Sequence, residues 1–484
     1  MTRRWILVSA LCAVTCPAPA EPKVEYLAVL VGGKKLGYVK HTRAVAGGKV
    51  TTSQEMVLTM KRLNTAMTIK QSEGATETAA GKPLSFRSVQ ELGIMAQTME
   101  GTVKPDGAVE VTVASGETKK KMTMPWPEGA LLPEGLRLLS ARKGLKKGTT
   151  YTAKAFMSSM LKAMDVAIRV GDTKDVDLLG RVVSLTEVQT VMTAPTGRIE
   201  STSYVDKDLN ALKTVVPMMG MQLEMIVCGK AVAMSESETL DFFDKLLVAS
   251  PKPLTDVRSA RSIRYTVQPT GKNARLVFLS SPSQKVAREA DGGFAVTVTP
   301  VSPAKGVAFP YKGSDAAAAA AMKPTRFLQC RAKEVVDLAR AAVGKVTDAA
   351  EAARRIESFV GRHINNKNLS VGYATALEVA KSKQGDCSEH AVLAAAMCRA
   401  VGIPAQVVTG LAHVKRLGDR SDVFVPHAWF RVYLGGKWID YDAALRAYDA
   451  GHIALAAGDG DPEDFFGVIN TLGYFKIAAV SVKR

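Results

Sequence analysis

Gly385-Asp386-Cys387-Ser388-Glu389-His390 opens the stretch around which the rest of this chain is organised. Residues 387–401 contain no Gly or Pro and are rich in Ala, Leu and Met, which predicts an α-helix. Asp386 is suited to cap the start of this helix, and Glu389 can reach back to the capping residue. Cys387 is therefore predicted to lie in the first turn.

A cysteine in this position has a favourable electrostatic setting for chemistry. The N–H groups and the positive end of the helix dipole favour a thiolate, and one of these N–H groups could stabilise an oxyanion. The alternative is a small buried apolar residue, which is our interpretation of Cys398 in the same helix.

A β-hairpin is predicted further along, because residues 427–434 and 437–442 alternate in polarity around Gly435-Gly436. One face of this hairpin is apolar and should face the core; it comprises Ala428, Phe430, Val432, Leu434, Ile439, Tyr441 and Ala443.

The other face carries the polar side chains. In this register Asp442 lies diagonally across from His427, within reach of a hydrogen bond, and Arg431 lies opposite Asp440. The register therefore predicts that Asp442 orients the imidazole of His427, while Arg431 and Asp440 form an ion pair.

These segments together resemble the transglutaminase-like (papain-like cysteine) superfamily, over roughly residues 325–460. The segments that carry the resemblance are Gly385-Asp386-Cys387-Ser388-Glu389-His390-Ala391, Arg399-Ala400-Val401-Gly402-Ile403-Pro404-Ala405, His427-Ala428-Trp429 and Trp438-Ile439-Asp440-Tyr441-Asp442.

The resemblance implies that Cys387 is the nucleophile, His427 its base and Asp442 the residue that orients the imidazole. It also implies an α+β core in which the helix that bears the cysteine packs on an antiparallel sheet. Two positions depart from the family pattern, Ala443-Ala444 in place of Pro-Thr and Gln406 in place of Arg. They remove no member of the triad but leave the choice of substrate open.

The N-terminus has the pattern of a secretory signal peptide. Arg3-Arg4 precede an apolar run from Trp5 to Cys16, and Pro17-Ala18-Pro19-Ala20 follows. We predict cleavage after Ala20, so that residues 1–20 are removed and the protein is secreted or periplasmic. A short membrane anchor or lipidation at Cys16 are the alternatives.

Composition sets limits on the partners. The net charge of +18 comes from Lys and Arg scattered over all regions, which indicates a solvated surface. A second interpretation is attraction to an acidic cell wall or an anionic membrane surface. The sequence carries no nucleic-acid-binding module, and it does not specify an oligomeric state.

Cysteine usage does not indicate a disulfide framework. Cys228, Cys330, Cys387 and Cys398 remain after the predicted cleavage. Cys228 and Cys330 could pair, whereas Cys387 must stay a free thiol to act.

The sequence predicts a multidomain protein with three regions after the signal peptide. Residues 21–235 are predicted as a β-rich region, 236–324 as a small β domain and linker, and 325–484 as the transglutaminase-like domain. Within the small domain we expect a helix at 238–248 and strands at 263–267, 275–278 and 294–298. Met218-Met219-Gly220-Met221 is interpreted as core or groove filler rather than a ligand site.

The remaining histidines can be interpreted either as metal ligands or as ordinary structural residues. His390 lies one turn after Cys387, and this Cys/His pair, with His413 or His427 and Asp442, could form a zinc site, but no second Cys pair supports it. His452 is interpreted as a solvent or core histidine. No acidic loop of calcium-binding spacing occurs, so we expect no Ca²⁺ requirement. We also predict neither another metal nor a cofactor.

The sequence therefore predicts thiol-dependent acyl transfer on protein or peptide amides, as a cysteine peptidase or amidase or as a transglutaminase. Transfer of acetyl or glycan-linked groups is a second enzymatic alternative. In a further alternative, the C-terminal domain is a catalytically silent scaffold in a secreted binding protein.

Overall fold

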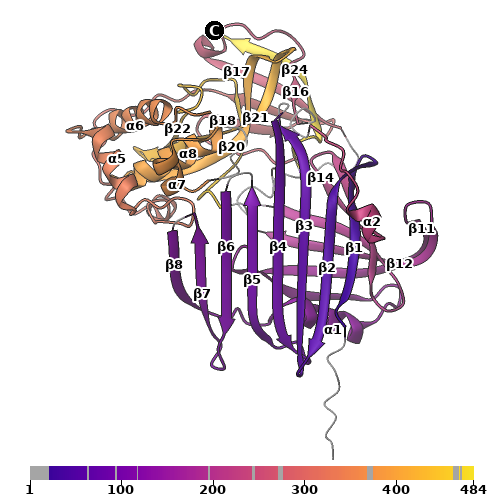
Figure 1. Ribbon diagram of the computed structural model, residues 1–484. Coiled ribbons are helices and arrows are strands. Elements are labelled where there is room, and N and C mark those ends of the chain that lie inside the picture. The colour runs from indigo at the N-terminus through magenta and orange to yellow at the C-terminus, as the bar shows by residue number, and fades with distance from the viewer. Residues whose placement is uncertain are drawn as a thin grey trace, which may run out of the picture.

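The computed structural model describes residues 21–62, 65–92, 95–116, 118–194, 197–241, 246–270, 276–367, 374–461, 468 and 471–484 (Figure 1). The predicted signal peptide, residues 1–20, lies outside the described residues. Within the described ranges, no helix combines the length and the apolar character that a membrane span needs.

The N-terminal half of the described chain forms one large sheet, in which β9 pairs with β10 in parallel and the other neighbouring strands are antiparallel. The strand order is β8 to β1 and then β15 to β9. The strands are β1 (Lys23–Val31), β2 (Lys34–Ala46), β3 (Lys49–Arg62), β4 (Thr65–Thr78), β5 (Pro83–Leu92), β6 (Met95–Val103), β7 (Ala108–Ser115), β8 (Thr118–Pro125), β9 (Ala130–Leu131), β10 (Thr150–Met157), β11 (Lys162–Asp177), β12 (Val182–Ala194), β13 (Gly197–Val205), β14 (Ala211–Met218) and β15 (Met221–Cys228).

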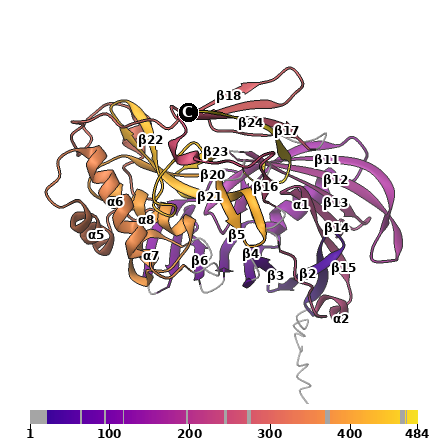
Figure 2. The same ribbon diagram turned by 90° about the horizontal axis from the view of Figure 1, so that it is seen from above.

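This sheet curls back on itself. In Figure 1 the indigo strands β1–β8 stand in front and the magenta strands lie behind them, and Figure 2 gives the same arrangement from above. Phe86 of β5 and Phe156 of β10 join the two halves of the curled sheet, with ring centroids 4.9 Å apart in one apolar cluster. The short helices α1 (Pro133–Lys143) and α2 (Lys230–Ala233) lie in the connections.

A helical layer covers the C-terminal sheet. The helices are α4 (Ala316–Ala320), α5 (Lys333–Val343), α6 (Ala349–His363), α7 (Ala376–Ser382) and α8 (Cys387–Ala400). The sheet runs in the order β16-β21-β20-β23, with β22 paired to β21. Its strands are β16 (Val248–Ala249), β20 (Ala405–Leu417), β21 (Arg420–Leu434), β22 (Lys437–Tyr441) and β23 (His452–Gly458).

The long strands β20 and β21 enter two separate cores. Val407 and Phe430 are buried with the helices α5–α8. Leu411 and Phe424, nearer the other end of the same strands, are buried with a smaller sheet. Burial of each such side chain contributes about 2 kcal/mol, so both cores hold these strands in place.

The smaller sheet unites segments that are far apart in sequence. Its order is β18-β19-β17-β24, with β17 (Ser262–Pro269), β18 (Gln284–Arg288), β19 (Phe294–Val298) and β24 (Phe475–Lys483). The segment 236–324, predicted as a small domain, therefore shares its sheet with the C-terminal strand. It also shares the C-terminal sheet, because β16 pairs with β21.

Two local predictions for this segment are wrong. Residues 238–241 and 246–248 are not helical, and residues 242–245 of that predicted helix lie outside the described residues. Val248 instead pairs with Phe424, because a neighbouring strand edge is available there. Of the strand predicted at 275–278, residues 276–278 are irregular and residue 275 lies outside the described residues. The strands predicted at 263–267 and 294–298 are confirmed.

The methionine-rich segment lines an apolar pocket, as its interpretation as groove filler predicts. Met218 and Met219 lie at the turn between β14 and β15. With apolar side chains of β1–β4 they enclose a cavity of about 290 Å³. This pocket lies away from the hairpin and helix that were singled out in the sequence.

Candidate active site

The helix α8 begins at Cys387, as its sequence predicts. The N–H of Ser388 donates to Asp386 Oδ1 at 3.0 Å, and the N–H of Asp386 donates to Glu389 Oε2 at 2.9 Å. The two residues form the predicted reciprocal capping pair. Burial, aided by the charge of Asp386, raises the pKa of Glu389 to about 8.

Cys387 is half-buried and packs against the core formed by the helices and the sheet. The helix that begins with it packs against β20 and β21, as Figures 1 and 2 both show. The N–H groups of Ser388 and Glu389 are bonded to the Asp386 side chain. A hydrogen bond to an oxyanion would therefore have to come from another donor, such as the N–H of Cys387 itself.

The hairpin has the predicted register. Phe430 pairs with Tyr441, Arg431 with Asp440, and Leu434 with Lys437. The apolar face is buried in the helical core, as predicted, and comprises Ala428, Phe430, Val432, Leu434, Ile439, Tyr441 and Ala443. The turn at Gly435-Gly436 accounts for this, because both glycines have positive φ and a two-residue loop determines the register.

The structure brings His427 and Asp442 into direct contact. His427 Nε2 donates to Asp442 Oδ2 at 2.7 Å, and both side chains are buried. The other carboxylate oxygen, Oδ1, accepts the N–H groups of Ala444 at 2.8 Å and Leu445 at 3.0 Å. Burial acts to raise the pKa of Asp442, but the charge and hydrogen bond of His427, together with His452, hold it far below its ordinary value.

Arg431 and Asp440 lie opposite each other, but their side chains bond to other partners instead of forming the predicted ion pair. The guanidinium of Arg431 donates to Gln406 Oε1, at 3.0 Å from Nε and 2.6 Å from Nη2. Asp440 instead accepts Trp429 Nε1 at 2.9 Å and the hydroxyl of Ser283. The amide of Gln406, one of the positions that departs from the family pattern, is therefore the hydrogen-bond partner of a buried arginine.

His452 is the residue that the sequence reasoning missed. Its Nε2 donates to Asp442 Oδ2 at 3.0 Å, so the same oxygen serves two imidazoles. No local pattern links His452 to Asp442, because His452 begins β23, which pairs with β20 rather than with the hairpin strand β22. The interpretation of His452 as a solvent or core histidine therefore overlooked its contact with the site.

Among the described residues, His427, Asp442 and His452 form a group that could be considered for a metal, since their ligand atoms lie within 4.8 Å of one another. The contacts of 2.7 and 3.0 Å are hydrogen-bond lengths. They are shorter than the separation of about 3.3 Å between ligands of a tetrahedral zinc ion. The zinc alternative also relied on Cys387 and His390, and this group includes neither.

His390 is instead bonded to its own helix. Its Nδ1 donates to the carbonyl oxygen of Asp386 at 2.5 Å. Burial lowers the pKa of His390, and the carboxylate of Asp442 acts in the opposite direction. His413 forms a contact of 3.3 Å with Asp422.

The other thiols have different surroundings from Cys387. Within the described residues Cys228, Cys330, Cys387 and Cys398 are all free, so the possible pairing of Cys228 with Cys330 is not formed. Cys398 is fully buried, as predicted, and burial raises the pKa of its thiol.

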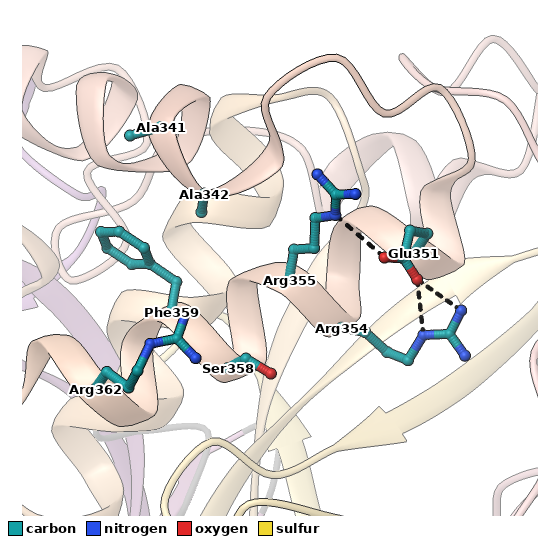
Figure 3. Close-up of a pocket in the computed structure, with 8 residues that line it drawn as sticks. All are labelled: Ala341, Ala342, Glu351, Arg354, Arg355, Ser358, Phe359 and Arg362. Atoms are coloured by element: carbon teal, nitrogen blue, oxygen red, sulfur yellow. Dashed lines mark hydrogen bonds and ion pairs between the residues drawn. The ribbon is translucent and has the colours of Figure 1, made fainter.

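A surface pocket of about 430 Å³ lies between α5 and α6, but it contains none of the predicted catalytic residues (Figure 3). Arg354 and Arg355 point toward Glu351 and bond to its carboxylate, which offsets part of their positive charge. The pocket is therefore not an extension of the candidate active site.

Comparison with known proteins agrees with the resemblance seen in the sequence. Residues 336–443 match the family model of the transglutaminase-like superfamily. The C-terminal part of this β-rich chain is therefore a transglutaminase-like domain. Comparison with curated proteins found no match.

Several solved structures are similar to parts of the chain. A candidate cysteine protease from Cytophaga hutchinsonii is 19% identical, with a TM-score of 0.31 over 46% of this chain and 86% of that one. A β-barrel-like protein of unknown function from Brucella abortus is 13% identical, with a TM-score of 0.34 over 43% of this chain and 95% of that one. A TGase is 15% identical, with a TM-score of 0.21 over 35% and 47%.

Proposed function

We propose that this chain carries out thiol-dependent acyl transfer on protein or peptide amides, with Cys387, His427 and Asp442 as its catalytic groups. The observation that carries the proposal is the 2.7 Å hydrogen bond from His427 Nε2 to the buried carboxylate of Asp442. Because Nε2 is engaged, a proton would pass between the imidazole and the thiol through Nδ1. Cys387, at the capped start of α8, supplies that thiol.

In the first half-reaction the thiolate of Cys387 attacks the carbon of a carboxamide and a C–S bond forms. A backbone N–H at the start of α8 stabilises the oxyanion. The C–N bond then breaks as His427 gives its Nδ1 proton to the leaving amine, which leaves a thioester. Asp442 holds the imidazole in the tautomer that this transfer requires.

In the second half-reaction water or an amine attacks the thioester and gives its proton to His427, and the C–S bond breaks to restore the thiolate. Water gives a peptidase or amidase, whereas a lysine amine gives a cross-linked protein. We favour hydrolysis, because water needs no dedicated acceptor groove. These steps use no metal or cofactor.

The setting of the reaction is also part of the proposal. The signal-peptide pattern with cleavage after Ala20 favours a secreted or periplasmic protein. The substrate there is a protein or peptide. The net charge of +18 would favour contact with an acidic cell wall or an anionic membrane surface.

The first experiment measures alkylation by iodoacetamide near pH 6, with the modified cysteine identified by peptide mass mapping. We expect Cys387 to react much faster than a free model thiol, because a neighbouring imidazolium keeps it ionised. The His427→Ala variant should lose this selectivity. The Cys228→Ala variant is the matched control, since Cys228 is a half-buried thiol of the N-terminal sheet.

If Cys387 reacts no faster than the model thiol, the domain is a catalytically silent scaffold and the enzymatic proposal is wrong. If it does react, a peptide library incubated with and without added amines, and analysed by mass spectrometry, separates the possible products. Cleaved amides identify hydrolysis and amine adducts identify cross-linking. Both must disappear in the Cys387→Ala variant, while transfer of acetyl or glycan-linked groups would produce neither.

A further inference from the structure

His452 forms the centre of a buried chain of hydrogen bonds. Its side chain is almost completely buried at the start of β23. Nε2 donates to Asp442 Oδ2 at 3.0 Å, and Nδ1 lies 3.1 Å from Asp449 Oδ1. A neutral imidazole has only one N–H. The carboxylates of Asp442 and Asp449 can therefore both accept a hydrogen bond from His452 only when His452 is an imidazolium.

The contact of His452 with Asp442 bears directly on His427. Oδ2 accepts both imidazoles, and the centroids of the two rings are 5.8 Å apart. Oδ1 is bonded to the N–H groups of Ala444 and Leu445. The position of the oxygen that orients His427 therefore depends on a second imidazole that does not itself need to touch the substrate.

The surroundings of His452 favour its positive charge. Asp442 and Asp449 contact it directly, and Asp440 interacts with it electrostatically. From β21 the ring of Trp429 packs edge-on at 5.2 Å, and Tyr448 packs at 4.8 Å.

Cations and further ionisable groups lie outside this direct contact. The guanidinium of Arg258 acts on Asp449, while Tyr265 donates its hydroxyl to the carbonyl oxygen of Ala450. Burial acts to lower the pKa of His452, but the hydrogen bonds to Asp442 and Asp449 raise it to about 9. His452 therefore carries a charge at neutral pH.

We propose that His452 is a positioning residue for the acyl transfer proposed above, and that it holds Asp442 as an anion in the place from which it orients His427. The inference rests on that proposed function. The positive charge of His452 also offsets part of the negative charge of Asp442, so that His427 can release the proton it has accepted. Replacing the outer partner of a metal ligand typically changes activity by about 10-fold to 100-fold, and we expect an effect of that order here.

The test is the rate of Cys387 alkylation by iodoacetamide as a function of pH, measured on the mature full-length chain. The variant is His452→Gln, whose amide can still donate to Asp442 but carries no charge. Loss of a nearby positive charge raises the pKa of both the thiol and the imidazolium, so the midpoint should move up by about one pH unit. We expect the plateau rate to fall about 10-fold because His427 is less well oriented.

The matched control is His363→Gln, because His363 lies in the same domain and bonds to the carbonyl oxygen of Ala380 rather than to Asp442. It should leave both the midpoint and the plateau unchanged. If His452→Gln does not fold by circular dichroism, His452→Asn replaces it, since it also carries no charge and should move the midpoint in the same direction.

The outcomes separate the two proposals. If Cys387 is reactive in the wild type and the folded variant has the same midpoint and plateau, the role of His452 is wrong while the proposed function stands. If Cys387 of the wild type is no more reactive than a free thiol, the proposed function fails first. A lower plateau with an unmoved midpoint would also contradict the inference, because a purely structural defect would produce it.

Discussion

Asp442 is the side chain on which the geometry of the candidate site depends most. Both of its carboxylate oxygens are occupied, Oδ2 by the imidazoles of His427 and His452 and Oδ1 by backbone N–H groups. Its own N–H donates to Glu357 Oε1 at 2.8 Å. A carboxylate held from so many directions cannot rotate away, which is what the proposed role of Asp442 in orienting the imidazole of His427 requires.

The charge of His452 should also be visible in the stability of the protein. Its pKa is raised from 6.5 to about 9, so the native state retains a proton that the unfolded chain loses above pH 6.5. The free energy of unfolding should therefore fall as the pH rises through this window, by about 3 kcal/mol in total. Urea unfolding at pH 6.5 and pH 9 measures this loss.

The His452→Gln variant provides the reference for this measurement. Glu389, whose pKa burial raises to about 8, also destabilises the native state as pH rises, but it does so in both proteins. The wild type should lose more stability than the variant over this window. Equal losses in the two proteins would contradict a charged His452.

At the scale of the element, the close approach of β23 to β20 places His452 beside the hairpin. The pairing of these strands is irregular between Thr409 and Gly410. A side chain at Gly410 would meet the carbonyl oxygen of Ile453 at 2.0 Å and the ring of Trp429 at 2.9 Å. The absence of a side chain at Gly410 therefore allows the strand that carries His452 to lie where it does.

The Gly410→Ala variant should accordingly push β23 away from β20. We expect a loss of about 1–3 kcal/mol in the free energy of unfolding, as for overpacked cores, together with slower alkylation of Cys387. The matched control is Gly74→Ala in β4, where the new carbon would be 3.7 Å from the carbonyl oxygen of Thr52, an ordinary contact. If both variants are as stable as the wild type in urea, the close approach is not a constraint.

At the scale of the whole molecule, the segment before the transglutaminase-like domain forms part of its support. The side-chain amide of Gln284 donates to the carbonyl oxygen of Ala454 at 2.7 Å, and its carbonyl accepts the N–H of Ala454 at 2.8 Å. Ser283 donates to Asp440, beside Trp429. The smaller sheet therefore braces both β23 and the polar face of the hairpin.

This arrangement predicts how fragments of the chain behave. A fragment of residues 325–484 lacks β16–β19, so it exposes the apolar residues that pack against them, among them Leu411, Phe424 and Ile453. We expect it to be poorly soluble and protease-sensitive, whereas residues 237–484 should give a cooperative thermal transition by circular dichroism. A cooperative transition of similar midpoint for both fragments would show instead that the shorter one is an independent domain.

Much of the candidate site could be predicted because its determinants are local. The capping pair of Asp386 and Glu389 determines where α8 begins, and so places Cys387 at its first residue. The two-residue turn determines the hairpin register, and the register brings His427 and Asp442 together. Interactions between residues close in sequence need little more than the right residue types at the right spacing.

What the sequence alone determined about this protein is therefore the helix that carries the thiol, the hairpin that carries the imidazole and the carboxylate, and the transglutaminase-like resemblance. The tertiary structure decided the partners of the site: His452 on Asp442, Gln406 on Arg431, and Ser283 on Asp440. It also decided that β24 completes a sheet with β17 from far earlier in the chain. These contacts depend on which strands lie side by side, and strand pairing between distant segments is selected by burial in a shared core rather than by any local pattern.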